Sequence, residues 1–356
     1  MSRPPLLFTP GPTQVRPEVL EAFGAEVISH RGPEMAALIE EILPGIRSVF
    51  ETREAILLSS SSASGLMEGS IRNCVARRCL HLVSGAFGER WRQVAADCGR
   101  EPESLQVEPG EPFTPEAVDE ALSKGGYEAV CLTHNETSTG VTNPLAPIAR
   151  VVRKHEGVLL MVDAVSSLGG IPVNMDANGI DVCFASVQKA IALPPGFSLC
   201  AVSQRALAKA RGMKGRGYYF DFARLAEASE KGQPLATPSV SHLMALRVQL
   251  RLMQQEGLEK RYARHAAMAE RVRTWARGRF GILARSGFES NTVTCVTNRR
   301  AIRVADFIQR LKGRGYQISN GYGNLKEATF RIGHMGEHTL RGVEALLQVM
   351  DEVLQT

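Results

Sequence analysis

The sequence has 356 residues, 44% of them hydrophobic and 22% charged, with a net charge of +5. This length and balance are typical of a globular protein with about two domains. Lysines and arginines are scattered, without a basic run interleaved with aromatic residues, which argues against a nucleic-acid-binding surface. No apolar run approaches ~18 residues and the N-terminus has no signal-like apolar region, so we expect a soluble, cytoplasmic protein without a membrane segment.

The seven cysteines form no C-x-x-C pair, and several stand inside apolar runs, as Cys131 and Cys183 do. Cysteines in such surroundings are typically reduced core residues of cytosolic proteins. We therefore expect free thiols.

The chain begins with a proline-rich segment. Residues 1–15 carry four prolines and are predicted to form an extended arm with a tight turn at Gly11. Pro17 suits the first position of a helix, and a second helix is expected from Glu34 to Phe50.

A serine-rich loop follows the first predicted strand. Residues 55–58 are apolar, four serines come next, and Ala63 and Ser64 open a helix. The unpaired N–H groups and the dipole of a helix N-terminus favour an anion. The arrangement indicates a phosphate-binding loop, and the alternative is a solvated loop.

Short apolar strands and helices then alternate. Strands are predicted from Cys79, at 129–132, up to Asp163, at 182–186 and at 197–203, with helices at 86–99 and 144–157. This alternation is typical of βαβ units in a mostly parallel sheet, whose ligands collect at the carboxyl ends of the strands. Those ends carry the serine loop, Phe87, residues 134–139, Asp163 and Lys189.

Lys189 is the residue around which a site is most readily built. It follows the apolar run 182–186 and precedes a loop with Pro194, Pro195 and Gly196. A lysine is usually a solvated surface charge. One that follows directly on a core strand loses water, which lowers its pKa and makes a neutral amine available for a Schiff base with a carbonyl.

The C-terminal part predicts a smaller α+β domain. Residues 211–242 are expected to be loop-rich with a short helix, followed by one long helix to about Arg277. Strands and helices alternate after it, and Thr339 is a suitable N-cap for the last helix. We therefore expect an arm at 1–15, a large domain at 16–255 and a small domain at 256–356.

These side chains together suit a cofactor with an aldehyde, a pyridine ring and a phosphate. Lys189 would bind the aldehyde, and the carboxylate of Asp163 would keep the pyridine nitrogen protonated so that the ring accepts electrons. Phe87 would lie on the ring face, and Ser138 or Gln188 would bond the ring hydroxyl. Asp163 taken alone is equally consistent with a turn or a helix cap.

Arg331 completes the set of candidates. It follows a short predicted strand, and its planar guanidinium suits a substrate carboxylate. His334 and His338 stand nearby, but no carboxylate or cysteine completes a metal-ligand spacing, so no metal is expected.

Eight motifs in order resemble the class V aminotransferases, and in particular the alanine/serine:glyoxylate aminotransferase branch. The motifs cover nearly the whole chain and are TPGPT at 9–13, SHR at 29–31, SSASG at 61–65, HNETSTG at 134–140, VDAVSSLGG at 162–170, SVQKA at 186–190, ATPS at 236–239 and FRIGHMG at 330–336.

This resemblance implies an α/β protein of the fold-type I class that uses pyridoxal 5'-phosphate. It implies a large domain with a mostly parallel sheet between helices, a small C-terminal α+β domain and a homodimer with active sites at the subunit interface. The roles that it implies are the following: Lys189 as Schiff-base lysine and proton shuttle, Asp163 as partner of the pyridine nitrogen, Gln188 and Ser138 at the ring hydroxyl, Ser62, Ala63 and Ser64 around the phosphate, Thr237 at the phosphate of the neighbouring subunit, and Arg331 at the substrate carboxylate with Gly11 close by.

The sequence departs from the family pattern at the phosphate loop, where Ser62-Ala63-Ser64 replaces Ser-Gly-Thr or Ser-Gly-His. It also departs at Phe87, where tryptophan is frequent, and at Pro234, where some relatives have tyrosine. The implied reaction is ping-pong transfer of an amino group from alanine, serine or aspartate to a 2-oxo acid such as glyoxylate or pyruvate. The alternatives are a lyase or cysteine desulfurase of the same fold, or a catalytically silent member of the family.

Overall fold

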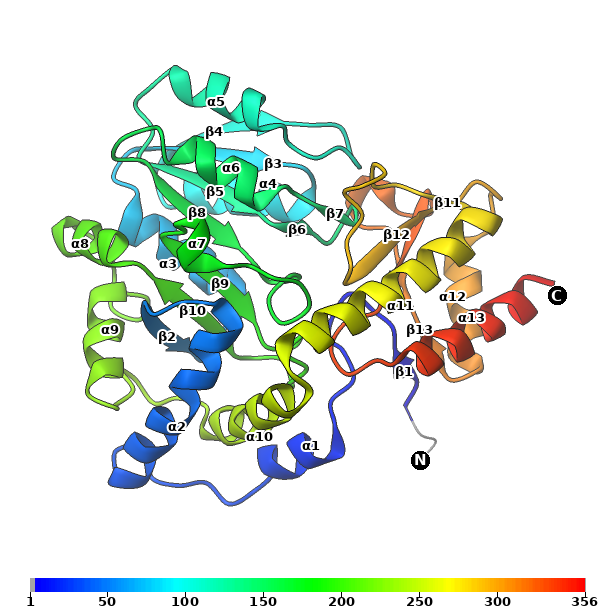
Figure 1. The fold of residues 1–356 in the computed structure, drawn as a ribbon, viewed down its shortest axis with the longest axis horizontal. Coiled ribbons are helices and arrows are strands. Elements are labelled where there is room, and N and C mark those ends of the chain that lie inside the picture. The colour runs from blue at the N-terminus through cyan, green and yellow to red at the C-terminus, as the bar shows by residue number, and fades with distance from the viewer. Residues whose placement is uncertain (1–3, 356) are drawn as a thin grey trace.

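The computed structural model describes residues 4–355, and its centre is a seven-stranded sheet (Figure 1). Across the sheet the strands are β2 (Ala55–Ser59), β10 (Ser198–Val202), β9 (Val182–Ser186), β8 (Leu159–Asp163), β5 (Ala129–Thr133), β3 (Arg78–Val83) and β4 (Glu101–Gln106). Paired strands are parallel except for β10, which runs antiparallel to both of its neighbours. The predicted, mostly parallel sheet is confirmed.

Helices cover both faces of this sheet, which is why its inner strands are nearly continuous apolar runs. Successive residues of a strand point to opposite faces, so on β8 Leu160 and Val162 join one core while Leu159 and Met161 join the other. The helices of the first core are α1 (Pro17–Phe23), α2 (Pro33–Phe50), α5 (Pro115–Ser123), α6 (Leu145–Val152), α7 (Met175–Asn178) and α10 (Val240–Glu256). Those of the second core are α3 (Ala63–Cys74), α4 (Ala86–Asp97), α8 (Gln204–Gly212) and α9 (Phe222–Glu230).

A second, antiparallel sheet lies in the C-terminal part of the chain (Figure 1). Its order is β11 (Gly281–Ile282), β12 (Val293–Thr297), β15 (Thr329–Gly333) and β14 (Ser319–Asn320). The helices around it are α11 (Leu258–Arg279), α12 (Val304–Gly313) and α13 (Leu340–Gln355), and they share a separate apolar core with it. Thr339 caps α13 as expected, because its hydroxyl accepts a hydrogen bond from the N–H of Gly342 at 3.1 Å.

The N-terminal arm joins these two parts. Its strand β1 (Leu6–Leu7) pairs with β13 (Tyr316–Gln317), next to the smaller sheet, and α1 (Pro17–Phe23) packs on α10 beside the larger one. No residue from 4 to 15 is helical, as predicted, and residues 1–3 of the predicted arm lie outside the described chain. The division into parts at residues 15 and 255 stays a prediction.

The expected single helix up to Arg277 is wrong. The chain forms two helices there, α10 and α11, because Gly257 between them adopts φ +80°, a backbone conformation that only glycine reaches easily. Also absent from the sequence analysis are the edge strand β4 and the helix α5. β4 has the polar sequence EPESLQ and is largely exposed at the sheet edge, so it shows neither an apolar run nor strict alternation. Smaller elements are the hairpin β6 (Asn135–Glu136) with β7 (Val141–Thr142) and the 3₁₀ turn Gly323–Leu325.

Candidate active site

The predicted site residues converge at the carboxyl edge of the larger sheet. Asp163 ends β8, and Lys189 follows β9 three residues after its last residue, Ser186. The two strands are adjacent and parallel, with Asp163 paired to Phe184. Their ends therefore deliver the carboxylate and the lysine to one side of the sheet.

The N-terminal arm forms hydrogen bonds with the main chain around Lys189. The N–H of Thr13 donates to the carbonyl of Gln188 at 3.2 Å, and the hydroxyl of Thr13 donates to the carbonyl of Lys189 at 3.0 Å. The ammonium of Lys189 donates to the carbonyl of Pro10. Burial lowers the pKa of Lys189 to about 8, although the nearby carboxylate of Asp163 opposes the change.

Gly11 lies directly against the lysine side chain. A Cβ atom built at Gly11 would stand 2.5 Å from Cδ of Lys189, and Gly11 has φ +122°. The structure thus brings the turn against the lysine, a contact that the sequence analysis did not predict, and it leaves no space there for a larger residue. The implied position of Gly11 near the substrate carboxylate at Arg331 stays a prediction.

Asp163 is 3% exposed, and its Oδ1 accepts a hydrogen bond from the N–H of Val165 at 2.8 Å. Burial raises the pKa of Asp163 to about 7, and the charge of Glu136 adds to the rise. A buried carboxylate with one backbone donor retains acceptor capacity for a cationic N–H group.

The serine loop opens α3 at the same edge. Ser62 is the N-cap and makes no side-chain capping bond, while Ala63 and Ser64 form the first turn of the helix. The N–H of Ala63 donates to the hydroxyl of Ser186 at 3.0 Å, which ties the helix start to the end of β9. The helix N-terminus and the neighbouring hydroxyls form a donor set that suits a phosphate.

Glu136 is a residue that the sequence analysis missed as an individual candidate. It is fully buried, and its carboxylate accepts hydrogen bonds from the N–H groups of Phe87 and Gly88, both at 3.1 Å, and from the hydroxyl of Ser138 at 2.6 Å. Burial raises its pKa, against the effect of these hydrogen bonds. Glu136 therefore fixes the start of α4, and with it the backbone of Phe87. The polar run 134–139 was the only sign of it in the sequence.

Arg331 reaches the site from β15 of the smaller sheet. It is 8% exposed, its Nε donates to the carbonyl of Asn320 at 3.1 Å and its Nη1 donates to the carbonyl of Thr137 at 3.4 Å. Burial lowers its pKa. Within residues 4–355 no carboxylate forms an ion pair with it. A buried cation without a counter-charge is a strong receptor for an anion.

Gln188 supplies the test of whether a cofactor fits. Its Oε1 is buried and has no hydrogen-bond partner in the part of the chain that the structure describes. Leaving such an acceptor unpaired costs ~1–3 kcal/mol, so it indicates a missing donor. A hydroxyl on a bound ring would provide that donor, and the neighbouring lysine, carboxylate and helix N-terminus suit an aldehyde, a protonated ring nitrogen and a phosphate.

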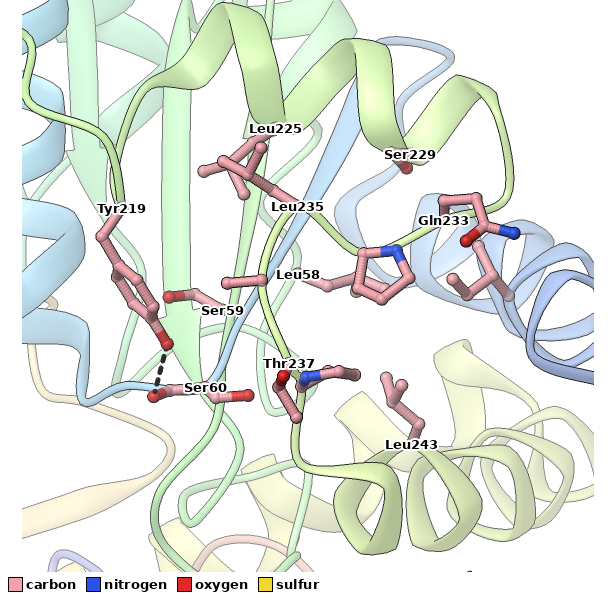
Figure 2. Close-up of a pocket in the computed structure, with 14 residues that line it drawn as sticks. Leu58, Ser59, Ser60, Tyr219, Leu225, Ser229, Gln233, Leu235, Thr237 and Leu243 are labelled. Atoms are coloured by element: carbon pink, nitrogen blue, oxygen red, sulfur yellow. Dashed lines mark hydrogen bonds between the residues drawn. The ribbon is translucent and has the colours of Figure 1, made fainter. Parts of the chain in front are cut away.

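Thr237 lies beside the serine loop of its own chain. It is exposed and lines a pocket together with Ser59 and Ser60 of that loop (Figure 2). The hydroxyl of Ser60 accepts a hydrogen bond from the N–H of Ser239 at 2.8 Å, which holds the Thr237 segment beside the serine loop. The position leaves the Thr237 hydroxyl available to a second molecule.

Comparison with known proteins decides the family. The family model described as aminotransferase class V matches residues 6–332. The chain belongs to this family. An uncharacterised aminotransferase of Methanocaldococcus jannaschii is 37% identical, with 93% of this chain and 88% of the relative aligned. The alanine–glyoxylate aminotransferase of Oryctolagus cuniculus is 34% identical over 98% of this chain and 92% of its own length. The solved structure of an alanine–glyoxylate aminotransferase from Nostoc sp. superimposes with a TM-score of 0.95 at 29% identity, covering 99% of this chain and 96% of that one.

This class V aminotransferase is therefore an enzyme of amino-group transfer, and members of its family use pyridoxal phosphate. The desulfurase alternative requires a mobile, reactive cysteine. Cys295 is buried in β12 and burial raises its pKa to about 11, so it is not suited to that role. All seven cysteines are free, as expected. No helix within residues 4–355 is long and apolar enough to cross a membrane.

Proposed function

We propose that this enzyme binds pyridoxal 5'-phosphate and moves the amino group of alanine, serine or aspartate to a 2-oxo acid such as glyoxylate or pyruvate, in ping-pong order. The observation that carries the proposal is the pair formed by the buried Asp163 at the end of β8 and the half-buried Lys189 just after β9, with pKa values of about 7 and about 8. The family membership and the names of the alanine–glyoxylate relatives support the choice of substrates.

The residues that would hold the cofactor differ in the part of it that each would bind. When bound, pyridoxal phosphate supplies an aldehyde for the amine and a ring that accepts electrons. Ser62, Ala63 and Ser64 at the start of α3 would bind its phosphate. Asp163 would accept the N–H of the pyridine nitrogen, and that positive partner would keep the carboxylate ionised at neutral pH.

Phe87 and Gln188 would orient the ring. The backbone of Phe87, held by Glu136, would place its side chain against the ring face. Gln188 has a free acceptor for the ring hydroxyl, whereas the hydroxyl of Ser138 already donates to Glu136 and accepts from the N–H of Ala86 at 3.0 Å. Ser138 would therefore contribute as a second acceptor only.

Lys189 would act at the reacting carbon. With a pKa of about 8, a sizeable fraction of its amine is neutral near pH 7.5, so Nζ accepts a proton from Cα of the amino acid and holds it for return. Arg331 would bind the carboxylate shared by amino acids and 2-oxo acids through its remaining N–H groups. Gly11 would leave room for the lysine and the substrate beside the arm.

A half-reaction screen tests this function. Each amino acid is added alone to the purified enzyme loaded with pyridoxal phosphate, and the change in cofactor absorbance is followed. We expect alanine, serine or aspartate to change the spectrum, with release of the matching 2-oxo acid. The Lys189→Ala variant is expected to lose transamination while it still binds the cofactor. Full activity in that variant would refute the proposed role of the lysine.

We also propose a cytoplasmic homodimer in which Thr237 reaches the phosphate of the partner's site. Thr237 is exposed, and Tyr218 and Tyr219 nearby in the chain expose 55% and 42% of their surface, which is typical of residues that a second subunit covers.

Mixing two inactive variants tests this arrangement. A dimer of Lys189→Ala with Thr237→Asp has one intact site only if Thr237 serves the partner, and random exchange of subunits then restores about a quarter of wild-type activity. If Thr237 serves its own chain, the mixture stays inactive. A monomer at the assay concentration would also refute the proposal.

A further inference from the structure

Arg90 is a second unpaired arginine beside the site. It lies on α4, one turn after Phe87, and its guanidinium carbon is 5.0 Å from the centre of the Phe87 ring. Its Nη2 donates to the hydroxyl of Tyr322 at 2.7 Å. Arg90 is exposed, and within residues 4–355 no Asp or Glu forms an ion pair with it.

The lack of a carboxylate partner distinguishes Arg90 from Arg92, the other arginine on α4. Arg92 forms an ion pair with Glu89 at 2.6 Å, one turn back on the same helix. Arg90 instead has an aromatic face and a phenol as partners, which fix a guanidinium without neutralising its charge.

Tyr322 connects Arg90 to Arg331. The guanidinium carbon of Arg331 is 5.4 Å from the centre of the Tyr322 ring, whose hydroxyl Arg90 binds. Two guanidinium groups from different parts of the fold, α4 and β15, thus meet at one tyrosine. Two positive charges at one aromatic ring, neither with a carboxylate partner within residues 4–355, favour an anion between or beside them.

Arg90 also lies near Lys189 and Asp163, where a bound substrate would react. Its charge is close enough to oppose protonation of Lys189 and to favour ionisation of Asp163. Arg331 already donates Nε and one Nη1 hydrogen to backbone carbonyls, which leaves three of its five N–H groups for a substrate. A carboxylate has two oxygens with about four acceptor positions, which is more than the three remaining N–H groups of Arg331 can fill.

We propose that Arg90 is a second binding residue for the carboxylate common to the amino acid and the 2-oxo acid, and that Tyr322 holds it in position. The inference rests on the proposed function of the same site. It adds that carboxylate recognition uses two arginines from two parts of the fold, and that it is independent of the side chain of the substrate.

Steady-state kinetics of three variants test the proposal. Arg90→Gln removes the charge, Tyr322→Phe removes the hydroxyl that holds it, and Arg92→Gln is the matched control on the same helix. We expect Arg90→Gln to raise KM about tenfold for alanine, aspartate and glyoxylate alike, with an unchanged cofactor spectrum. Tyr322→Phe should raise KM by about threefold, and Arg92→Gln should leave KM unchanged.

A measurement without turnover separates this proposal from the proposed function. Propionate is titrated into each protein loaded with cofactor, and its binding is followed by the change in cofactor absorbance or by calorimetry. The dissociation constant should rise about tenfold in Arg90→Gln, whether or not transamination occurs. An unchanged affinity for propionate, a KM effect limited to aspartate, or loss of the cofactor from Arg90→Gln would each overturn the proposal.

Discussion

The buried carboxylate of Glu337 is predicted to contribute strongly to stability. It follows β15 in the loop before α13, its side chain is 6% exposed, and it accepts hydrogen bonds from Arg261 at 2.9 Å and from Gln249 at 2.8 Å. Arg261 is 1% exposed and also donates to the carbonyls of Gly169 and Ala190, so the same cluster holds the chain next to Lys189.

The size of the stabilisation by Glu337 follows from the pKa of its carboxyl group. Burial alone would raise the pKa of Glu337, but the charge of Arg261 and the hydrogen bond from Gln249 hold it at about 2, against an ordinary value of 4.5. This difference corresponds to roughly 3 kcal/mol of stability. Because the pKa is lower in the folded state, the contribution is complete above pH 4.5 and is lost as the pH falls towards 2.

Urea unfolding of Glu337→Gln measures this contribution. At pH 7 we expect the free energy of unfolding of this variant to be about 3 kcal/mol lower than that of the wild type. At pH 3 this difference should be smaller. Glu344→Gln is the control, because Glu344 has 55% of its side chain exposed and is 4.0 Å from Arg271, and it should change stability by less than about 0.5 kcal/mol. Equal effects of the two substitutions, or a gap independent of pH, would refute the reasoning.

Two further predictions concern the lysine. Gly11→Ala should lower kcat/KM by at least about tenfold, because the added methyl group displaces Lys189, whereas Gly99→Ala, with φ +72° and nothing within 4 Å, should lower stability alone. Equal activity losses in these two variants would contradict the steric explanation. Because burial lowers the pKa of Lys189 to about 8, the rate at which the apoenzyme takes up pyridoxal phosphate should rise between pH 7 and 9 and then level off. A flat profile in stopped-flow absorbance would show that the amine is not the titrating group.

Much of the larger sheet was predictable because its strands are buried on both faces. An apolar run such as 182–186 then appears in the sequence whatever its neighbours are. β4 has one exposed edge and a polar sequence, and nothing in the local pattern distinguishes it from a loop. The break at Gly257 was missed because an isolated glycine is tolerated inside a helical pattern, and only its backbone conformation in the structure separates the two helices.

The sequence by itself determined which chemical groups are available for the candidate site. A lysine behind a buried strand, an aspartate that ends another, and a serine loop before a helix are local features, and each is written in a few consecutive residues. Together with the eight motifs that resemble the class V aminotransferases, they predicted a pyridoxal phosphate enzyme with Lys189 and Asp163 at its centre.

Only the tertiary structure decided which polar residues surround that centre. The roles of Glu136, Arg90 and Tyr322 depend on contacts between distant chain segments, such as Glu136–Gly88 and Arg90–Tyr322, whose members are 48 and 232 residues apart in the sequence. Burial and charge act through distance in space, and no pattern along the chain encodes that distance.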